Sequence, residues 1–221
     1  MFPQFGFIPD RHGVRKLLTL FSRMRSSGLD FVSLRAGSYT DAFPMFLNWY
    51  PSDTKVLLPA LSPPVTAARV AFTSRDDLGE AMATILAHSQ TGTLASSFPS
   101  IKPQGQKKIL LLTGPEAQTF PDLVGAIDQT RPSHPKLETE FVEPQDLVQI
   151  SARDDQGGKP VGWFEIRNQF FESVIAGDGE TVDPALEVLL GRRPETGTEA
   201  AERLVRDAGE KGYFWHQNHM N

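Results

Sequence analysis

Two short, almost uninterrupted apolar runs place the strongest limit on how this chain can fold. The first, DFVSLRAG, contains Phe31, Val32 and Leu34, and the second, KKILLLTG, spans residues 107–114. Both runs are short and contain few polar residues, which is typical of strands buried on both faces of a parallel sheet. We therefore predict an α/β fold in which the two runs lie in one parallel sheet.

A helical pattern comes immediately before the first run. In DRHGVRKLLTLFSRMRSSGLD, apolar residues recur at helical spacing at Leu17, Leu18, Phe21 and Met24. Gly28 follows two serines and suits the position just after a helix end, where glycine adopts a left-handed conformation at little cost. A helix that leads into a buried strand is part of a βαβ unit.

Asp76 and Asp77, in VAFTSRDDLGEAMATILA, are either a catalytic or metal-binding carboxylate pair or the start of a helix. Local physics favours the helix. Ser74 is placed to accept from the backbone N–H of Asp77 while Asp77 reaches back, which makes a capping box, and the helix dipole stabilises negative charge in the first turn. We predict that the helix buries a single apolar face, formed by Leu78, Ala81, Met82, Ile85 and Leu86.

The rest of the chain divides into a long loop, an exposed connection and a helical last third. Residues 36–69 are expected to be a loop with one short helix near 43–50, and residues 88–106 are polar and rich in Ser, Gly and Pro. Asp154 and Asp155 precede two glycines and suit a turn. The remaining expected elements are a helix at 119–130 capped by Thr119 and Asp122, a half-exposed strand at 137–142, and helices at 161–177, 183–192 and 198–209.

Composition excludes several function classes. The net charge of −5 argues against the basic surface of a nucleic-acid-binding protein, and the absence of cysteine rules out thiolate metal sites, disulfides and cysteine nucleophiles. No apolar run approaches the length of a membrane span, and the N-terminus lacks a secretory signal pattern. We expect a cytoplasmic protein.

Motif searches leave few candidates for chemistry. The sequence contains no G-x-G-x-x-G, P-loop, G-x-S-x-G or H-E-x-x-H motif. His216 and His219 lack a third ligand and a rigid support, so we expect no metal site. His12 and Lys16 share a helix face, where they are either catalytic or part of a solvated basic surface.

Four stretches in the same order resemble NmrA-like proteins, a branch of the atypical short-chain dehydrogenase/reductases. They are MRSSGLDFVSLRAGSYTDAF, VAFTSRDDLGEAMATIL, KKILLLTGPEAQTFPDLVGAI and VDPALEVLLGRRPETGTEAAERLVRD, which together cover most of residues 22–207. Family members begin with a strand and a Gly-rich turn that holds the dinucleotide pyrophosphate at a helix N-terminus. The resemblance implies that this chain starts after the fifth strand, so that the first half of the Rossmann fold is missing.

The resemblance implies a partial Rossmann-like parallel sheet and a mainly helical C-terminal substrate region. The expected domains are a remnant of the NAD(P)-binding domain at 1–113 and the substrate-binding region at 114–221. The loop after the first strand passes the nicotinamide in this family, which assigns Ala36, Gly37, Ser38 and Tyr39 to cofactor binding, with Ala36 where the family has proline. A sheet without its central strands exposes an apolar edge. A truncated product, a rearranged fold, and a completing chain or homo-oligomer all stay open as explanations.

The implied function is an oxidoreductase that uses NADP or NAD on a small carbonyl or aromatic metabolite, in keeping with a tailoring step in secondary metabolism. The alternatives are a non-catalytic dinucleotide-sensing or partner-binding regulator and a degenerate member without a cofactor site. Lys16 loosely matches a lysine of some relatives, and His12 stands where the tyrosine of the superfamily's Tyr-x-x-x-Lys pair would fall. The aromatic side chains of the loop and the last third are either ordinary core or a substrate pocket formed by Phe43, Phe46, Trp49, Trp163, Phe164 and Phe170.

Overall fold

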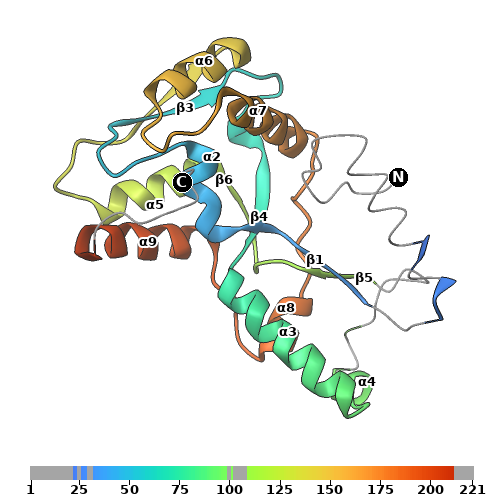
Figure 1. The fold of residues 1–221 in the computed structure, drawn as a ribbon. Helices are drawn as coiled ribbons and strands as arrows, with labels where there is room; N and C mark the ends of the chain where they lie inside the picture. The colour runs from blue at the N-terminus through green and yellow to red at the C-terminus, as the bar shows by residue number, and fades with distance from the viewer. Residues whose placement is uncertain (1–21, 24–25, 29–31, 99–100, 102–108, 212–221) are drawn as a thin grey trace.

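The computed structural model describes residues 22–23, 26–28, 32–98, 101 and 109–211 (Figure 1). The strands are β1 (Ser33–Ala36), β2 (Ser38–Tyr39), β3 (Lys55–Pro59), β4 (Arg69–Thr73), β5 (Ile109–Leu112), β6 (Ala117–Thr119) and β7 (Glu138–Val142). The α-helices are α2 (Phe43–Leu47), α3 (Arg75–Gln90), α4 (Leu94–Ser97), α5 (Phe120–Thr130), α6 (Pro144–Asp154), α7 (Val161–Ile175), α8 (Ala185–Leu190) and α9 (Gly197–Lys211). Two short 3-10 helices, η1 (Thr40–Ala42) and η2 (Val65–Ala67), complete the set.

The two apolar runs pair with each other as parallel strands, as predicted. β1 and β5 are hydrogen-bonded neighbours in the register Ser33↔Ile109 to Ala36↔Leu112. The α/β fold class is thus confirmed, although β1 begins at Ser33 and Phe31 lies outside the described residues. Gly28 has φ +74°, the left-handed conformation expected after a helix end, while most of the helix expected before it lies outside the described part of the chain.

The segment 36–69 is not the loop that the sequence predicted. β3 lies within it and pairs in parallel with β7, which is about eighty residues further along the chain, in the register Lys55↔Glu138 to Pro59↔Val142. Val56 and Leu58 of this strand are buried in the hydrophobic core. Its partner is distant in sequence and its apolar run is very short, so local patterning could not identify β3 as a strand. The sequence also missed α6, which begins with Pro144 and buries Leu147 and Val148.

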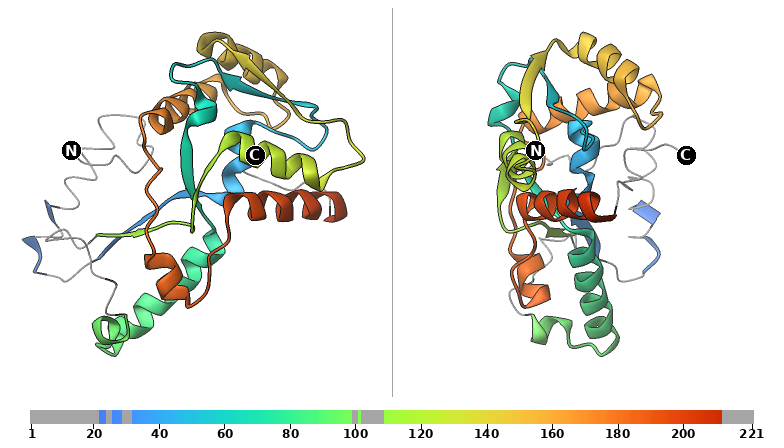
Figure 2. Two further views of the ribbon diagram at one scale, coloured as in Figure 1. Left: turned by 180° about the vertical axis from the view of Figure 1, so that it is seen from behind. Right: turned by 90° about the vertical axis from the view of Figure 1, so that its left-hand side faces the viewer.

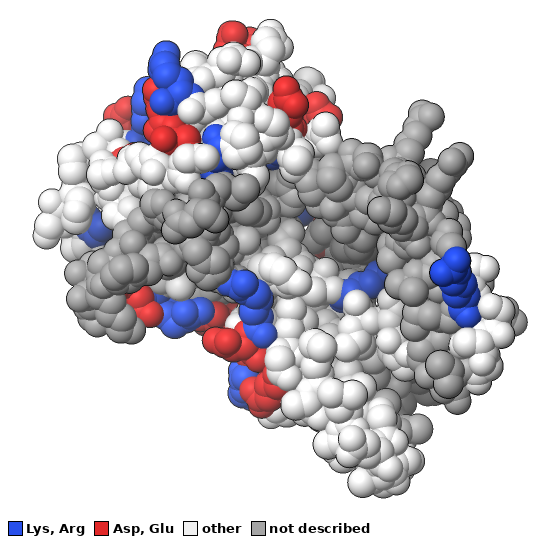
Figure 3. Space-filling view, viewed as in Figure 1, with Lys and Arg blue, Asp and Glu red and all other residues white. Residues whose placement is uncertain are grey.

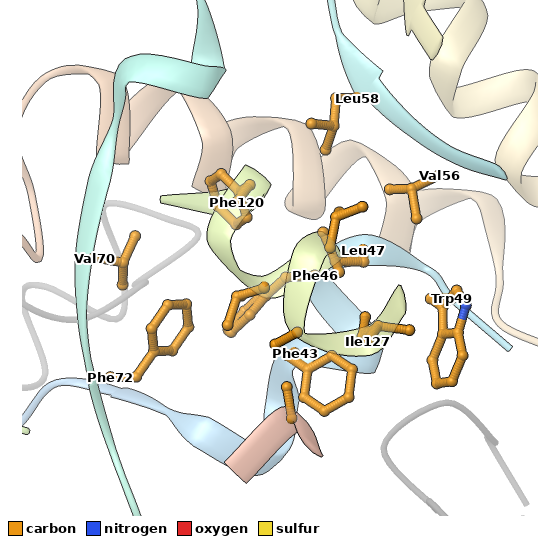
Figure 4. Close-up of a cluster of buried hydrophobic side chains, with 14 of the residues drawn as sticks. Phe43, Phe46, Leu47, Trp49, Val56, Leu58, Val70, Phe72, Phe120 and Ile127 are labelled. Atoms are coloured by element: carbon orange, nitrogen blue, oxygen red, sulfur yellow. The ribbon is translucent and has the colours of Figure 1, made fainter. Parts of the chain in front are cut away.

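The buried apolar side chains form two hydrophobic cores. The larger joins α2, β3, β4, α5, α7 and α9, and aromatic side chains fill much of it (Figure 4). The smaller packs α3 and α8 against one face of the β1–β5 pair. Figures 1 and 2 show α3, α4 and α8 at one end of the molecule, with β4 running from near α7 toward the start of α3. Within the described residues, no helix is both long and apolar enough to cross a bilayer.

The buried face of α3 is narrower than predicted. Leu78, Ala81 and Ile85 are buried, but Met82 is 47% exposed and Leu86 is 61% exposed. The helix packs on α8 and the β1–β5 pair along one side, and that single contact layer covers a narrow stripe. The prediction that Met82 and Leu86 are buried was therefore wrong.

The start of α3 shows what the two aspartates do. Ser74 accepts from the backbone N–H of Asp77 at 3.4 Å, as predicted. The Asp77 carboxylate, however, does not reach back to the cap. It accepts hydrogen bonds from the Arg192 guanidinium at 2.7 Å and from the backbone N–H of Glu195 at 2.9 Å, and Asp77 as a whole is 4% exposed. Asp77 thus ties α3 to the α8–α9 connection. The complete capping box is found at Thr119 and Asp122 of α5, as the sequence predicted.

Candidate functional site

The carboxyl ends of four strands meet where β1 passes from one ladder to another. The Gly37 N–H donates to the carbonyl of Leu112, the last residue of β5, at 3.0 Å. After Gly37 the chain leaves β5 and continues as β2, which pairs with β4. The Thr73 hydroxyl at the end of β4 donates to the same Leu112 carbonyl at 3.2 Å. Ligands of open α/β sheets bind outside the carboxyl ends of parallel strands, so this junction is the candidate site.

Two glycines allow the strands to approach each other at this junction. A Cβ built on Gly37 would overlap the Ala71 carbonyl oxygen and lie 2.6 Å from the Thr73 hydroxyl oxygen. The Gly114 N–H donates to the Phe72 carbonyl oxygen at 2.7 Å, and a Cβ on Gly114 would overlap that same oxygen. The space at both glycines is filled by the backbone of β4. Gly37 is therefore required for strand packing, independently of any ligand.

We expect Gly37→Ala to lower the free energy of unfolding by about 1–3 kcal/mol, because the new methyl group must displace the β4 backbone. Gly79→Ala is the matched control. Gly79 lies inside α3 with open space around it, so alanine there should raise stability by up to about 1 kcal/mol through helix propensity. Urea unfolding monitored by circular dichroism measures both. Equal stability of Gly37→Ala and the parent chain would contradict the tight junction.

The four residues predicted to bind cofactor occupy different environments. Ala36 is partly buried against the smaller core, Gly37 is enclosed by β4, and Ser38 is half-buried. Tyr39 is 45% exposed at the end of β2, and the Arg75 guanidinium carbon lies 5.9 Å from the centre of its ring. Tyr39 is thus the member of this set best placed to contact a ligand, and the cofactor role of all four stays a prediction.

Most of the predicted pocket aromatics pack in the protein interior. Phe43, Trp49 and Phe164 have almost no exposed surface, and Phe46 stacks on Phe170 with ring centroids 4.3 Å apart. The sequence left two interpretations open for these aromatic residues, ordinary core or substrate pocket. The buried ones are part of the hydrophobic core (Figure 4). Trp163 and Phe170 are half-buried, so contact with a substrate stays a prediction for these two above all. His12, Lys16, His216 and His219 lie outside the described residues.

A buried polar cluster joins the turn before α7 to Tyr50, which follows α2. The sequence predicted the turn at Asp155 but not the cluster. The Asp155 carboxylate accepts from the Tyr50 hydroxyl at 2.7 Å and from the Lys159 ammonium at 2.5 Å. It also accepts from the backbone N–H groups of Gly157 and Lys159, which confirms the predicted turn. Tyr50 is over a hundred positions away along the chain, so no local pattern could reveal the cluster.

A second buried charge lies in the larger core. The Arg167 guanidinium donates to the carbonyls of Phe46 at 2.7 Å and Leu57 at 2.9 Å and to the Ser151 hydroxyl at 3.1 Å. Burial lowers the pKa of Arg167 to about 9, which leaves the group charged at neutral pH. The Arg167 guanidinium thus ties α7 to α2, β3 and α6.

The surface around the junction carries paired charges. Arg192 contacts Asp77 and Glu80, Arg203 contacts Glu195, and Arg193 contacts Glu199. On the face drawn in Figure 3, blue and red atoms accordingly lie side by side. This part of the surface has no single-sign field of the kind that steers polyanions.

The residues at the junction fit one end of a dinucleotide. The exposed ring of Tyr39 can stack on a nicotinamide-like ring. The half-buried Ser38 hydroxyl can hydrogen-bond to the amide of that ring. The pyrophosphate of such a cofactor needs a Gly-rich turn at a helix N-terminus, and that motif is not found in the 221 residues. The fit is therefore limited to the nicotinamide end.

Comparisons with known proteins identify the relatives of this chain. No family model matches the sequence. An NmrA-like family domain-containing oxidoreductase of Aspergillus flavus is 31% identical over 194 residues, which is 88% of this chain and 55% of that protein. The chain thus spans about half the length of this curated relative.

Solved structures share the fold. A triphenylmethane reductase of Citrobacter sp. matches with a TM-score of 0.66 and 18% identity over 93% of this chain and 62% of its own. An NADPH-dependent quinone oxidoreductase of Escherichia coli matches with a TM-score of 0.62 and 17% identity over 89% and 62%. The architecture shared with these reductases is the Rossmann-like one that the strand pairing indicated. Over most of its length this chain is thus similar in sequence to an NmrA-like family oxidoreductase, and it shares its fold with the two reductases.

Proposed function

We propose that this chain belongs to an NAD(P)H-dependent oxidoreductase that acts on a small aromatic or carbonyl compound, with the nicotinamide end of the cofactor at the strand junction. The observation that carries the proposal is the exposed Tyr39 ring, which lies where the parallel strands end. The names of the related proteins support it, since they include an NmrA-like oxidoreductase and an NADPH-dependent quinone oxidoreductase. A tailoring role in secondary metabolism is part of this proposal.

Each group at the junction would have a defined part. When bound, the dinucleotide supplies a hydride. The Tyr39 ring would stack on the substrate or the nicotinamide, and the Ser38 hydroxyl would orient the carboxamide. The close strand contacts at Gly37 keep these two residues in position, because the neighbouring backbone of β4 leaves no room for movement.

One observation favours a second function. The sequence has no Gly-rich pyrophosphate loop. The second function is therefore the binding of a ligand or partner without catalysis, as in the regulators of the NmrA-like family. Dinucleotide binding by the isolated chain separates a cofactor-binding protein from a degenerate one, and hydride transfer separates an enzyme from a sensor.

The test uses the purified chain and NADPH, followed by fluorescence enhancement of the dihydronicotinamide and by the shift in melting temperature. We expect binding, and we expect Tyr39→Ala to weaken it about 5- to 10-fold, the size of a lost aromatic stacking contact. Met82→Ala, which removes an equally exposed apolar side chain from α3, is the control and should bind like the parent chain.

Consumption of NADPH with naphthoquinone as acceptor then tests catalysis. Turnover would support the oxidoreductase proposal, and binding without turnover would point to the sensing function. Absence of any NADPH binding would refute both.

A further inference from the structure

One edge of the β3–β7 sheet is open. The Glu138 N–H donates to the Thr54 carbonyl at 2.9 Å, and the parallel register runs without a break from there to Val142. Glu138 and every second residue after it thus bond to β3, so the backbone groups of Thr139 and Phe141 point to the other side. In the described part of the chain, β7 pairs with β3 alone and no group bonds to this outer edge.

The opposite edge of the sheet, along β3, is closed. The Arg167 guanidinium donates to the Leu57 carbonyl at 2.9 Å, and the Leu61 N–H donates to the Pro59 carbonyl at 3.1 Å. Proteins commonly blunt an exposed edge with a bulge, a proline or a lysine. β7, with the sequence ETEFV, has none of these. Its outer edge is therefore a regular strand of the kind to which an extended peptide can add.

One face of β7 is acidic. Glu138 and Glu140 lie on it, and Lys55 pairs with Glu140 at 2.8 Å. This hydrogen bond is the main cause that raises the pKa of Lys55, and the charges of Asp154 and Glu138 add to it, so three carboxylates gather around one ammonium. Asp154 also pairs with Arg153. Among the described residues, Glu138 is the one of these three carboxylates that has no salt bridge.

The other face of β7 is apolar near its end. Phe141 lies beside Leu58 in the register, and Leu58 is fully buried in the larger core. Phe141 itself is 50% exposed, so the apolar surface continues from the core onto the open side of the strand. An apolar side chain from an added strand would cover this ring, a favourable kind of cross-strand contact.

Charge distinguishes a second copy of this chain from a different partner. Antiparallel pairing of two β7 strands would place the glutamates of both copies on the same face, and like charges on neighbouring strands are destabilising. A segment with Lys or Arg at every second position instead places cations beside Glu138 and Glu140. The residues between those cations then lie on the same face as Phe141.

We propose that the open edge of β7 binds an extended segment of a partner protein in which basic residues alternate with apolar ones. The backbone groups of Thr139 and Phe141 make the hydrogen bonds, and the two faces of β7 select the side chains. This inference goes beyond the oxidoreductase function and does not depend on it, because β7 contributes no residue to the strand junction.

Fluorescence anisotropy with a labelled peptide of alternating Lys and Val provides the first test. We expect saturable binding to the parent chain, and we expect none with a peptide of alternating Glu and Val. A peptide with the same Lys and Val residues in two blocks should bind about 5-fold more weakly, because it cannot present the two kinds of side chain on opposite faces. Equal affinity for the block peptide would show bulk charge attraction and overturn the proposal.

Backbone methylation of the peptide isolates the strand contact. Methylation of every second amide removes the N–H donors from one edge of the peptide, either at the lysines or at the valines. One of these two methylated peptides should keep its affinity and the other should lose it, because only one edge faces β7. If both bind as tightly as the unmethylated peptide, no strand is added and the proposal is wrong.

Variants of the chain locate the surface. Glu138→Gln should weaken binding of the Lys-Val peptide about 2- to 5-fold, the size of one exposed ion pair. Glu187→Gln is the matched control, because Glu187 is an exposed glutamate on α8, at the end of the molecule where α3 and α4 lie (Figure 1). Equal losses in the two variants would assign the effect to overall charge and overturn the proposal.

Thr139→Pro tests the backbone of β7 directly. Proline removes the outward N–H and leaves the ladder to β3 in place, so we expect peptide binding to be lost while circular dichroism stays that of the parent chain. If this variant fails to fold, the methylated peptides decide the question on the parent chain.

Sedimentation velocity of the parent chain and Thr139→Pro tests the other occupant. We expect the same sedimentation coefficient for both, and a dimer that Thr139→Pro dissociates would show that a second copy occupies β7 and that the proposal is wrong. Peptide binding by a chain that never oxidises NADPH would refute the oxidoreductase function alone. NADPH oxidation without peptide binding would refute this surface alone.

Discussion

Asp155→Ala is expected to lower the free energy of unfolding by about 3–5 kcal/mol, the usual cost of removing one partner from a buried ion pair. The Lys159 side chain is fully buried, and the aromatic rings of Tyr50 and Trp163 lie 5.2 and 5.4 Å from its ammonium. The variant would keep this ammonium buried and deprive it of its carboxylate counter-ion. Urea unfolding followed by tryptophan fluorescence measures the loss.

The neighbouring Asp154 provides the control. It pairs with Arg153 on the surface, where both side chains are more than half exposed, so Asp154→Ala should change stability by no more than about 1 kcal/mol. The double variant Asp155→Ala/Lys159→Met should be more stable than Asp155→Ala alone, because it also removes the buried charge. If Asp155→Ala were as mild as Asp154→Ala, the cluster would contribute nothing to stability.

The same cluster predicts how stability depends on pH. Burial raises the pKa of Asp155, but hydrogen bonds from Lys159 and Tyr50 outweigh it, so the folded-state pKa lies below the ordinary value. A depressed pKa stabilises the fold above the unfolded-state pKa of about 3.9, and that contribution disappears as the pH falls through the folded-state pKa. The stability difference between the parent chain and Asp155→Ala should therefore shrink below about pH 4. A difference that stays constant into acid would show that Asp155 does not act through its charge.

Arg167→Met is expected to cost about 2–4 kcal/mol, because several buried acceptors lose their donor at once. The Phe46 carbonyl near the end of α2 and the Leu57 carbonyl of β3 both accept from this guanidinium. Methionine replaces the apolar stem of the side chain but lacks the guanidinium and donates no hydrogen bond. The removal of a buried charge offsets part of the loss, which sets the lower bound of the range.

Chemical denaturation of Arg167→Met and Arg153→Met provides the comparison. Arg153 is largely exposed, so its replacement should change stability by about 0.5 kcal/mol or less. Arg167→Lys should also be destabilised, because an ammonium cannot reproduce the fork of donors that reaches carbonyls on two elements. A fully stable Arg167→Lys would indicate that charge alone, without the planar geometry, holds α2 and β3 to α7.

Short-range features were predictable because their causes lie within a few residues. The Thr119–Asp122 capping box, the left-handed Gly191 after α8 and the parallel β1–β5 pair all follow from local hydrogen bonding, backbone freedom or short apolar runs. The division into domains at residue 113 stays a prediction. So do the roles of His12 and Lys16, which lie outside the described residues.

Other features depended on contacts between distant parts of the chain. β3 is a strand because β7 pairs with it, and Asp77 is buried because Arg192 and Glu195 come from beyond α8 to meet it. The exposure of Leu86 reflects which side of α3 the neighbouring layer covers.

The sequence by itself determined the α/β class, the ends of several helices and the family resemblance, since these rest on periodicity, capping and short runs of adjacent residues. Tertiary structure alone decided which aromatic side chains became core and which, like Tyr39, stayed at the surface. The physical reason is that burial depends on which elements pack against a side chain, and a residue's own neighbours in sequence do not specify that.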